Sequence, residues 1–450
     1  MQNIKVDFSK IIKEMKPLHG VNNGPVTGAE MTRNNIADFS EMGVPYSRLH
    51  DTQYPYGQDH FVDIHCIFKN FDADPYNPES YDFDMTDLYL QKIFEAGANV
   101  IYRLGESIEH LPKKYYIYPP KDFMKWAQIC EGIIRHYTEG WANGFNYPIE
   151  YWEIWGEPDN YDLLWGGTDE EFFELYYVAS NHLKKCFPHL KIGGYGSSGF
   201  YEITKRVDWD KSQHCMEFAE NFLEYITRED KKSPLDFLSW HLYYQHPSEF
   251  LIQSAHLDKL LSKYGFNDTE NIITEWNVSG SFMKKEPIGG ALCGAIDSCI
   301  MSELQRKTNV KIATYYDVGS QFWNGLYTTN SRLKGFYSFK FYNELYKLKN
   351  EAETVEEIES ENIFCCAASD GKKGGVIVSN IGEKETVKLT MKGLAENTPV
   401  TAEVYYTDEE HDGELMKCEI FSGEIYSLML KLEKATTVFI KVRESVKSEL

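Results

Sequence analysis

Hydrophobic and polar residues alternate in two different ways along this chain of 450 residues. From about residue 18 to about residue 345, short runs of β-branched and aromatic residues are separated by longer segments with helical apolar periodicity. The short runs predict buried strands, and the longer segments predict amphipathic helices. The predicted strands are residues 18–22, 46–50, 99–104, 150–155, 191–195, 237–243, 272–275 and 312–316.

A helical segment follows each predicted strand. The first, residues 33–42, is expected to end at Gly43. Eight successive strand–helix pairs are the number found in a (β/α)8 TIM barrel. A doubly wound open sheet is the alternative, but no Gly-rich dinucleotide loop follows the first strand. The other predicted helices are residues 86–96, 121–137, 170–186, 214–227, 256–264, 291–305 and 335–348.

After about residue 350 the pattern changes to short strand-like runs separated by Gly, Asn, Asp and Lys, which predicts a C-terminal antiparallel β-sandwich. Residues 5–8 are also strand-like and are available to join the sandwich. We therefore predict an α/β barrel over residues 10–348 and a β-sandwich domain over residues 349–450 with the N-terminal strand 1–9. The strand-like runs are residues 363–369, 375–379, 386–391, 401–406, 424–430 and 436–442.

Composition argues against several classes of partner. The net charge of −23 disfavours nucleic acid and anionic membrane surfaces. No stretch is long and apolar enough to span a membrane, and residues 1–8 lack the features of a signal peptide. The nine cysteines include no CxxC pair, so reduced thiols are expected. These features together predict a cytoplasmic protein.

The candidate chemistry lies in two segments, residues 151–158 (YWEIWGEP) and 272–277 (IITEWN). Each is an apolar, β-prone run with a glutamate beside an aromatic residue. A carboxylate at the end of a buried strand is costly unless it is used or paired. Glu157 follows the fourth predicted strand and Glu275 ends the seventh, so both are expected at the carboxyl-terminal mouth of the barrel. Glycoside hydrolysis needs two such carboxylates, whereas two ordinary ion-paired glutamates are the alternative.

These motifs resemble those of a known family. Residues 152–159 (WEIWGEPD) resemble the fourth-strand motif of the retaining glycosidases of clan A, especially glycoside hydrolase family 39. Residues 274–277 (TEWN) resemble the nucleophile motif of that family. Residues 46–50 and 237–243 resemble its second-strand Arg-x-His element and its sixth-strand His and Tyr. The likeness covers nearly the whole chain.

The resemblance implies roles for the side chains at the barrel mouth. Glu157 would be the general acid and then the base, and Glu275 the nucleophile, kept ionised by neighbouring donors. The residues expected to contact the substrate or to support these two are Arg48, His50, Gly156, His241, Tyr243, Trp276 and Trp323.

Three histidines, His19, His50 and His241, fall at neighbouring strand ends, where a metal site is conceivable. No H-E-x-x-H or comparable ligand spacing supports one. No metal and no cofactor is therefore expected. For His50 and His241, a satisfied interior histidine is the alternative to a substrate-binding group.

One position departs from the family pattern. The clan usually carries Asn immediately before the acid/base glutamate, where it hydrogen-bonds the sugar 2-hydroxyl, and this chain carries Gly156. Three explanations are open. Another residue reaches the 2-hydroxyl, the substrate is bulky or differently configured at C2, or much of the activity is lost.

Aromatic residues make up 15% of the chain, which suits the stacking surfaces of a sugar-binding cleft, although most rings are expected in the core. Arg103 lies at the end of the third predicted strand and Glu106 just past it, where they address substrate hydroxyls or a carboxylate, or form a plain ion pair. The loop 53–81 is expected to wall one subsite. The candidate stacking residues are Trp155, Trp165, Trp276 and Trp323.

The sequence therefore predicts a retaining glycoside hydrolase that acts on small β-linked oligosaccharides or glycosides by double displacement. The resemblance implies β-xylosidase-like activity, exo action and a homo-oligomer, and the sequence does not identify the sugar. A catalytically impaired carbohydrate-binding protein on the same fold is the alternative, because Gly156 replaces the usual Asn.

Overall fold

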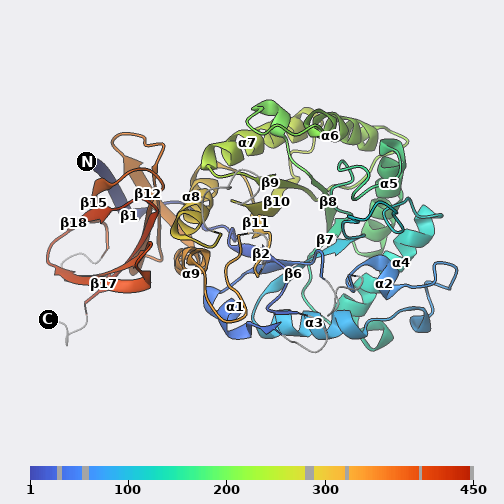
Figure 1. Ribbon diagram of the computed structural model, residues 1–450, viewed down its shortest axis with the longest axis horizontal. Coiled ribbons are helices and arrows are strands. Elements are labelled where there is room, and N and C mark those ends of the chain that lie inside the picture. Colours follow the sequence, from blue (N-terminus) through green and yellow to red (C-terminus); the bar gives the residue numbers. More distant parts are fainter. Residues whose placement is uncertain (28–32, 53–59, 279–287, 320–323, 395–397, 446–450) are drawn as a thin grey trace.

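The computed structural model describes residues 1–27, 33–52, 60–278, 288–319, 324–394 and 398–445. It contains a closed barrel and a separate nine-stranded sheet, which lie side by side in Figure 1. The barrel and its helices form the larger part, and the first and last strands of the chain both belong to the sheet.

The barrel consists of parallel strands that follow one another around the ring in chain order. Most of their residues are buried on both faces, because side chains fill the interior and helices cover the outside. All eight strands coincide with predicted ones. They are β2 (Gly20–Asn22), β5 (Tyr46–Arg48), β6 (Asn99–Leu104), β7 (Tyr151–Ile154), β8 (Lys191–Ser197), β9 (Phe237–Tyr243), β10 (Glu270–Asn277) and β11 (Ile312–Tyr315).

Helices surround the barrel strands in Figure 1. Gly43 ends the first helix with φ 65°, in the left-handed conformation that glycine adopts readily at a helix C-cap. A two-stranded ribbon, β3 (Val26–Thr27) and β4 (Arg33–Asn34), precedes that helix. The helices are α1 (Ile36–Met42), α2 (Ile64–Ile67), α3 (Asp84–Glu95), α4 (Phe123–Glu139), α5 (Asp169–Cys186), α6 (Ser212–Thr227), α7 (Pro247–Lys263), α8 (Ala291–Lys307) and α9 (Lys334–Tyr346).

The second sheet has the strand order β17-β16-β19-β14-β13-β12-β1-β15-β18. Side chains from both ends of this order share one hydrophobic core, so the sheet folds over on itself. Adjacent strands in this sheet are antiparallel, except β1 and β15, which pair in parallel. The strands are β1 (Gln2–Glu14), β12 (Asn350–Glu356), β13 (Ile363–Ser369), β14 (Lys373–Asn380), β15 (Glu385–Lys392), β16 (Val400–Thr407), β17 (Asp412–Phe421), β18 (Ile425–Leu432) and β19 (Thr436–Glu444).

Side-chain alternation in β13 joins the sheet to the barrel. Cys365 and Ala367 belong to the core of the sheet, whereas Cys366 and Ala368 belong to the core that includes the barrel helices. Nearby, Phe341 of α9 stacks on Phe439 of β19 with ring centroids 5.2 Å apart. Strand β13 is therefore buried on both faces, which explains its unbroken apolar sequence.

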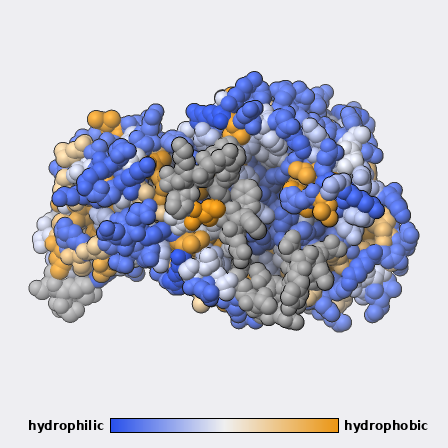
Figure 2. Space-filling model, in the orientation of Figure 1, coloured by the Kyte–Doolittle hydropathy of each residue, from blue (hydrophilic) through white to orange (hydrophobic). Residues whose placement is uncertain are grey.

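Several elements differ from the predicted ones, among them the short α2, β3 and β4. Helix α7 begins at Pro247, about two and a half turns before the predicted start at residue 256, because Pro stands at its first position and His246 caps it. Strands β12 and β17 were not predicted, because both carry many exposed polar residues. The described surface over the barrel helices is mostly hydrophilic in Figure 2, and no helix of the described residues is long and apolar enough to cross a membrane.

Candidate active site

The turn after β7 presents Glu157. The strand ends at Ile154, and Trp155 (φ 66°) and Glu157 (φ 47°) then both adopt the left-handed conformation. Each such residue costs about 1–2 kcal/mol, and strain of this kind collects at functional sites. The Glu157 amide donates to the Gly196 carbonyl of β8 at 2.8 Å, which fixes the turn against the neighbouring strand. The local strain thus sets the direction of one carboxylate.

Strand β10, separated from β7 by β8 and β9 in the ring, presents Glu275. Arg48 of β5 donates from Nη1 to Glu275 at 2.7 Å, and the Tyr243 hydroxyl donates to the other carboxylate oxygen at 2.6 Å. His50 Nε2 lies 3.3 Å from Glu275. Arg48 also donates from Nε to Glu153 of β7 at 2.6 Å. One fully buried guanidinium therefore pairs with two buried carboxylates.

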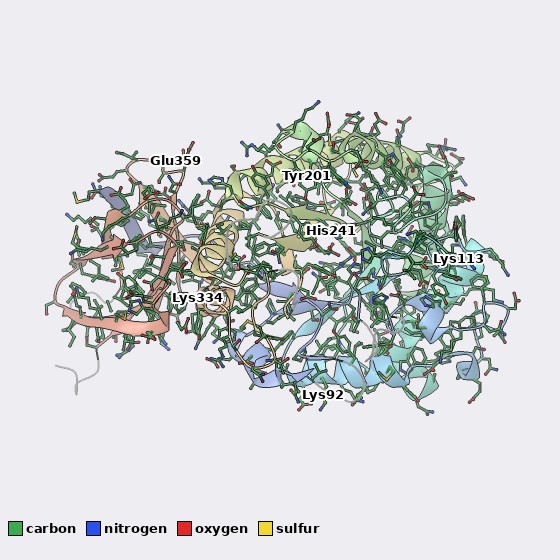
Figure 3. The ribbon with its side chains drawn as sticks, in the orientation of Figure 1. Lys92, Lys113, Tyr201, His241, Lys334 and Glu359 are labelled. Atoms are coloured by element: carbon green, nitrogen blue, oxygen red, sulfur yellow. The ribbon has the colours of Figure 1, made fainter. Side chains whose placement is uncertain are left out.

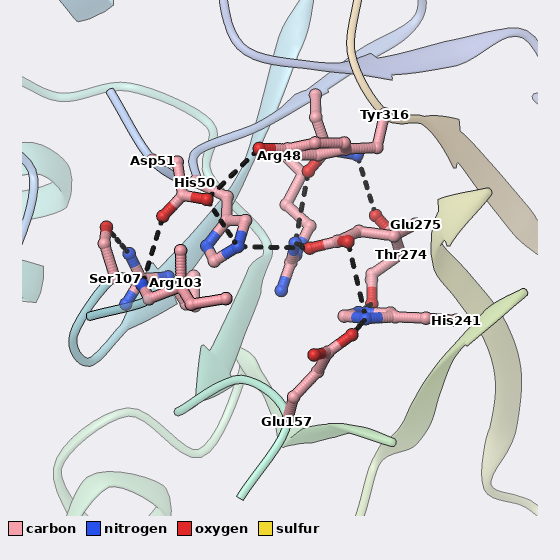
Figure 4. Close-up of polar contacts among 12 residues, drawn as sticks. Arg48, His50, Asp51, Arg103, Ser107, Glu157, His241, Thr274, Glu275 and Tyr316 are labelled. Atoms are coloured by element: carbon pink, nitrogen blue, oxygen red, sulfur yellow. Dashed lines mark hydrogen bonds and ion pairs between the residues drawn. The ribbon is translucent and has the colours of Figure 1, made fainter. Parts of the chain in front are cut away.

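His241 of β9 connects the two glutamates. Its Nδ1 lies 2.6 Å from Glu157 Oε1 and 3.5 Å from Glu275 Oε2, while its Nε2 lies 3.1 Å from the Thr274 hydroxyl. Figure 3 places His241 inside the ring of barrel strands, and Figure 4 shows both carboxylates converging on its imidazole. One oxygen of Glu157 and one of Glu275 lie within 4.8 Å of each other. The two carboxylates therefore face one shared space.

Burial shifts the pKa of each of these groups. It raises the pKa of the Glu157 carboxyl to about 7, although Asn160 donates a hydrogen bond to that carboxyl. Burial also raises the pKa of Glu275, and the charge of Arg48 offsets part of this rise. Burial lowers the pKa of His241 to about 4, so its imidazole is neutral near pH 7.

The structure brings together most of the residues predicted for the site. Arg48, His50, His241 and Tyr243 contact Glu275, and Gly156 lies beside Arg48. The roles of these residues in catalysis and substrate binding stay predictions.

The predicted stacking role of Trp276 is wrong. Its ring is fully buried and packs against Phe250, Tyr315 and Phe339, which lie on the helix side of β10, away from the carboxylates. Trp155 is also buried, and it packs edge-on against another predicted stacking residue, Trp165. Successive residues of a strand point to opposite faces, so Trp276, which follows Glu275, points away from the carboxylates. Trp323 and residues 53–59 lie outside the described residues.

Two other sequence-based candidates have partners that were not predicted. Arg103 does not pair with Glu106; it donates to Asp63 at 2.7 Å. Glu106 instead contacts the His65 imidazole. His19 lies apart from the site, with Nε2 3.2 Å from the Gly43 carbonyl and its ring against two tyrosines of α9.

Some side chains at the site were missed by sequence reasoning. Glu153 pairs with Arg48, Thr274 hydrogen-bonds His241, and Tyr316 donates to Asp51 at 3.1 Å. Asp51 in turn lies 3.4 Å from His50. Glu153 carried a signal, because a charged residue inside a buried strand requires a cation nearby.

Three groups of described residues place metal-ligating atoms within 4.8 Å of one another. In the group at the barrel mouth, Arg48 already holds Glu275, so a cation there would be repelled by the guanidinium. In the other two, carboxylates are bonded to Arg103 and Arg135. The absence of a metal stays a prediction. The groups are Glu157–His241–Glu275, Asp63–His65–Glu106 and Glu131–His182–Cys186.

The fold and the site define a class of proteins, the (β/α)8 barrels that carry paired glutamates at the ends of their fourth and seventh strands. The family model of the glycosyl hydrolases family 39 matches residues 39–288, which is more than half of the chain. The chain belongs to this family.

Curated relatives match part of the chain. A "Beta-xylosidase" of Caldicellulosiruptor saccharolyticus is 26% identical over 233 residues, covering 50% of this chain and 41% of that protein. A "Beta-xylosidase" of Geobacillus stearothermophilus is 26% identical over 186 residues, covering 36% of this chain and 32% of that protein. The chain thus matches less than half the length of these relatives.

Solved structures share the fold over nearly the whole chain. A glucosidase from Croceicoccus marinus superposes with a TM-score of 0.82 at 21% identity, covering 99% of this chain and 100% of that one. A monomeric beta-xylosidase from Caulobacter crescentus CB15 superposes with a TM-score of 0.73 at 16% identity, with the same coverage. At these identities the likeness establishes the fold.

Proposed function

We propose that the protein is a retaining glycosidase for β-linked sugars, with Glu157 as the general acid and base and Glu275 as the nucleophile. The observation that carries this proposal is the shared space between the two carboxylates, one oxygen of each lying within 4.8 Å of the other. Carboxyl groups about 5–5.5 Å apart suit direct attack on the sugar, whereas inverting enzymes need about 6.5–9.5 Å to admit a water.

The hydrogen bonds around His241 support the acid role of Glu157. The Thr274 hydroxyl donates to Glu153 at 3.0 Å, so its oxygen accepts from His241 Nε2. A neutral imidazole with a proton on Nε2 has a lone pair on Nδ1. Because Nδ1 lies 2.6 Å from Glu157 Oε1, a hydrogen bond there requires a proton on Glu157. The raised pKa of Glu157, about 7, agrees with this assignment.

The contacts of Glu275 favour its ionised form, which is the form needed for nucleophilic attack. It accepts hydrogen bonds from the Arg48 guanidinium and from the Tyr243 hydroxyl, and both stabilise its ionised form. Burial raises the pKa of Tyr243 well above its ordinary value, so this hydroxyl keeps its proton. Two carboxyl groups in one pocket thus have environments that push them toward different protonation states.

The reaction follows from these assignments. Glu157 protonates the glycosidic oxygen as Glu275 attacks the anomeric carbon, so the leaving alcohol departs and a glycosyl ester forms on Glu275. Glu157, now a carboxylate, removes a proton from water, which attacks the anomeric carbon and releases Glu275. His241 stays neutral and holds the protonated Glu157 carboxyl in place before the proton is transferred. The names of the curated relatives make a β-xyloside the first substrate to test.

A carbohydrate-binding protein without turnover is the second candidate, because Gly156 offers no side chain to the substrate. The strained turn that carries Glu157 and the proton assignment at His241 favour an enzyme, since binding alone requires neither.

The test compares wild type with Glu275→Gln on aryl β-xyloside, glucoside, galactoside, mannoside and N-acetylglucosaminide. We expect turnover of at least one glycoside by wild type and a loss of at least about 10³-fold in the variant, because the nucleophile is gone. Equal turnover by the two proteins refutes the assignment. Binding of a sugar by calorimetry without turnover at enzyme excess would support the binding protein.

A further inference from the structure

The loop that follows β7 connects Glu157 to a lysine at the start of α6. The Asn160 side chain donates from Nδ2 to Glu157 Oε2 at 3.1 Å, and its Oδ1 accepts a hydrogen bond from Lys211 Nζ at 2.9 Å. Lys211 also donates to the Tyr161 carbonyl at 2.6 Å, and its ammonium lies 4.3 Å from the centre of the Tyr161 ring. These contacts hold the lysine in place beside the Asn160 amide.

The orientation of the Asn160 amide follows from the chemistry of its two neighbours. An ammonium only donates hydrogen bonds, so the amide atom that faces Lys211 must be the oxygen. The amide nitrogen therefore faces Glu157, and Oε2 of that carboxyl accepts its hydrogen bond. A protonated carboxyl donates from one oxygen and accepts at the other. Because Oε2 is the accepting oxygen, the proton of Glu157 belongs on Oε1.

A second chain of hydrogen bonds places the proton on the same oxygen. His241 Nδ1 accepts from Glu157 Oε1 when its Nε2 donates to Thr274. The same Nδ1 lies 3.5 Å from Glu275 Oε2, so Oε1 of Glu157 borders the space that the two carboxylates share (Figure 4). His241 and Asn160 therefore act on different oxygens of Glu157, and together they direct its proton toward the space shared with Glu275.

We infer that Asn160 and Lys211 are positioning residues for the acid/base glutamate: Lys211 fixes the Asn160 amide, and that amide keeps the proton of Glu157 on Oε1 and stabilises the carboxylate once the proton has left. This inference rests on the proposed glycosidase function. A hydrogen bond to the charged form of a carboxyl favours that form, so the amide offsets part of the rise that burial causes in the pKa of Glu157. Without the amide, the carboxylate that must accept a proton from water in the second half of the reaction is less stable.

Both side chains can be changed without breaking the turn that carries Glu157. The Asn160 backbone donates to the Glu157 carbonyl at 3.0 Å and accepts from the Leu164 amide at 3.2 Å. The Lys211 carbonyl accepts from the Cys215 amide at 3.0 Å. Asn160→Leu keeps these backbone bonds and a side chain of similar shape but removes the amide donor. Lys211→Met keeps the apolar stem and removes the ammonium.

Other titratable groups around Glu157 are common to wild type and both variants. Burial raises the pKa of Tyr201, Cys215 and Tyr243, so these three stay neutral near pH 7. Burial also raises the pKa of Asp159 to about 7, so the measurement must separate this aspartate from Glu157. The charged or acid–base groups that also face Glu157 are Arg48, Asp51, Asp159, His241 and Glu275.

The experiment titrates Glu157 directly. Carbon-13 NMR of protein labelled only at the glutamate side-chain carboxyl carbon excludes Asp159, and Glu157→Gln identifies the signal of Glu157. We expect its midpoint to lie about one pH unit higher in Asn160→Leu than in wild type, because the carboxylate loses one hydrogen bond. Lys211→Met should shift the midpoint in the same direction. The double variant should shift it no further than Asn160→Leu, because Lys211 acts through Asn160.

Turnover across pH gives a second measurement. With a phenyl glycoside, the basic limb of kcat/KM should move to higher pH in Asn160→Leu. Its kcat/KM at about pH 8, divided by its own value near pH 5, should therefore exceed the same ratio for wild type roughly fivefold. Asn309→Leu is the matched control, because Asn309 also donates to a carboxylate, Asp258, at 3.1 Å and precedes β11 at the amino-terminal end of the barrel strands. This control should leave the midpoint and the limb in place.

A merely structural role for the pair would lower turnover at every pH and leave the midpoint of Glu157 unchanged; that result, or a midpoint that moves to lower pH, overturns the inference. Shifts that add in the double variant would show that Lys211 does not act through Asn160, which also overturns it. Failure of the proposed function is separate, since it shows as undiminished turnover in Glu275→Gln, and the NMR titration does not depend on turnover.

Discussion

Replacing Thr274 by Val tests whether the hydrogen-bond chain through His241 keeps Glu157 protonated. The change removes one buried hydroxyl and preserves the branched shape of the side chain. Without that acceptor, His241 no longer needs its proton on Nε2 and is free to place it on Nδ1, 2.6 Å from Glu157. An Nδ1 proton donates to the ionised Glu157 carboxylate, so the pKa of Glu157 should fall.

The size of the fall follows from the causes of the raised pKa. The pKa of Glu157 stands at about 7 against an ordinary 4.5, and burial, its largest cause, is unchanged in the variant. What Thr274 controls is one hydrogen bond, worth about 0.5–1.5 kcal/mol, or about one pKa unit. At about pH 8 the protonated fraction of Glu157 then drops from roughly one tenth to roughly one hundredth. We therefore expect kcat/KM of Thr274→Val to lie about tenfold below that of wild type at that pH and less than about twofold below it near pH 5.

The assay is kcat/KM across pH with a phenyl glycoside, whose poor leaving group needs the proton from Glu157. The basic limb of this profile reports the acid of the free enzyme. Thr86→Val is the matched control, because Thr86 is an equally buried threonine whose hydroxyl bonds the Phe61 carbonyl, far from the site. A basic limb that stays in place, or moves to higher pH, in Thr274→Val would refute the proton assignment.

Three further predictions concern charge. Arg48→Met leaves the buried Glu153 and Glu275 without their cation, so urea unfolding should show a loss of about 3–5 kcal/mol; wild-type stability would contradict the ion-pair assignment. Burial lowers the folded-state pKa of His19 from 6.5 to about 3, so its contribution to stability is lost as pH falls between these values. Between pH 6.5 and about pH 3, the free energy of unfolding of wild type relative to that of His19→Gln should therefore fall by up to about 1.4 kcal/mol per pH unit. If the free energies of unfolding of the two proteins change in parallel over this range, the lowered pKa of His19 is contradicted. Exhaustive dialysis against EDTA should leave turnover unchanged, and an activity restored only by a divalent cation would show that a metal is needed.

The barrel could be predicted because its strands are buried on both faces and therefore read as continuous apolar runs. Strand β17 could not, because it stands at one end of the strand order of the described residues, beside β16, and exposes most of its residues. The first half of α7 was missed for a similar reason, since its apolar stripe is weak and its start depends on a local cap at His246.

The two glutamates could be predicted because a carboxylate at the end of a buried strand is itself a signal. The contact between Thr274 and Glu153 could not, because barrel closure brings together residues 121 positions apart. Trp276 shows the opposite error. It follows Glu275 in the sequence, and the alternation of a strand directs it to the other face.

The most direct test of the proposed mechanism is the configuration of the first sugar released. Proton NMR of a β-glycoside digest, followed from the first minutes before mutarotation, distinguishes the two anomers. Double displacement through Glu275 predicts that the β-anomer appears first and that the α-anomer follows slowly. Appearance of the α-anomer first would mean direct attack by water, and it would contradict the role of Glu275 as nucleophile.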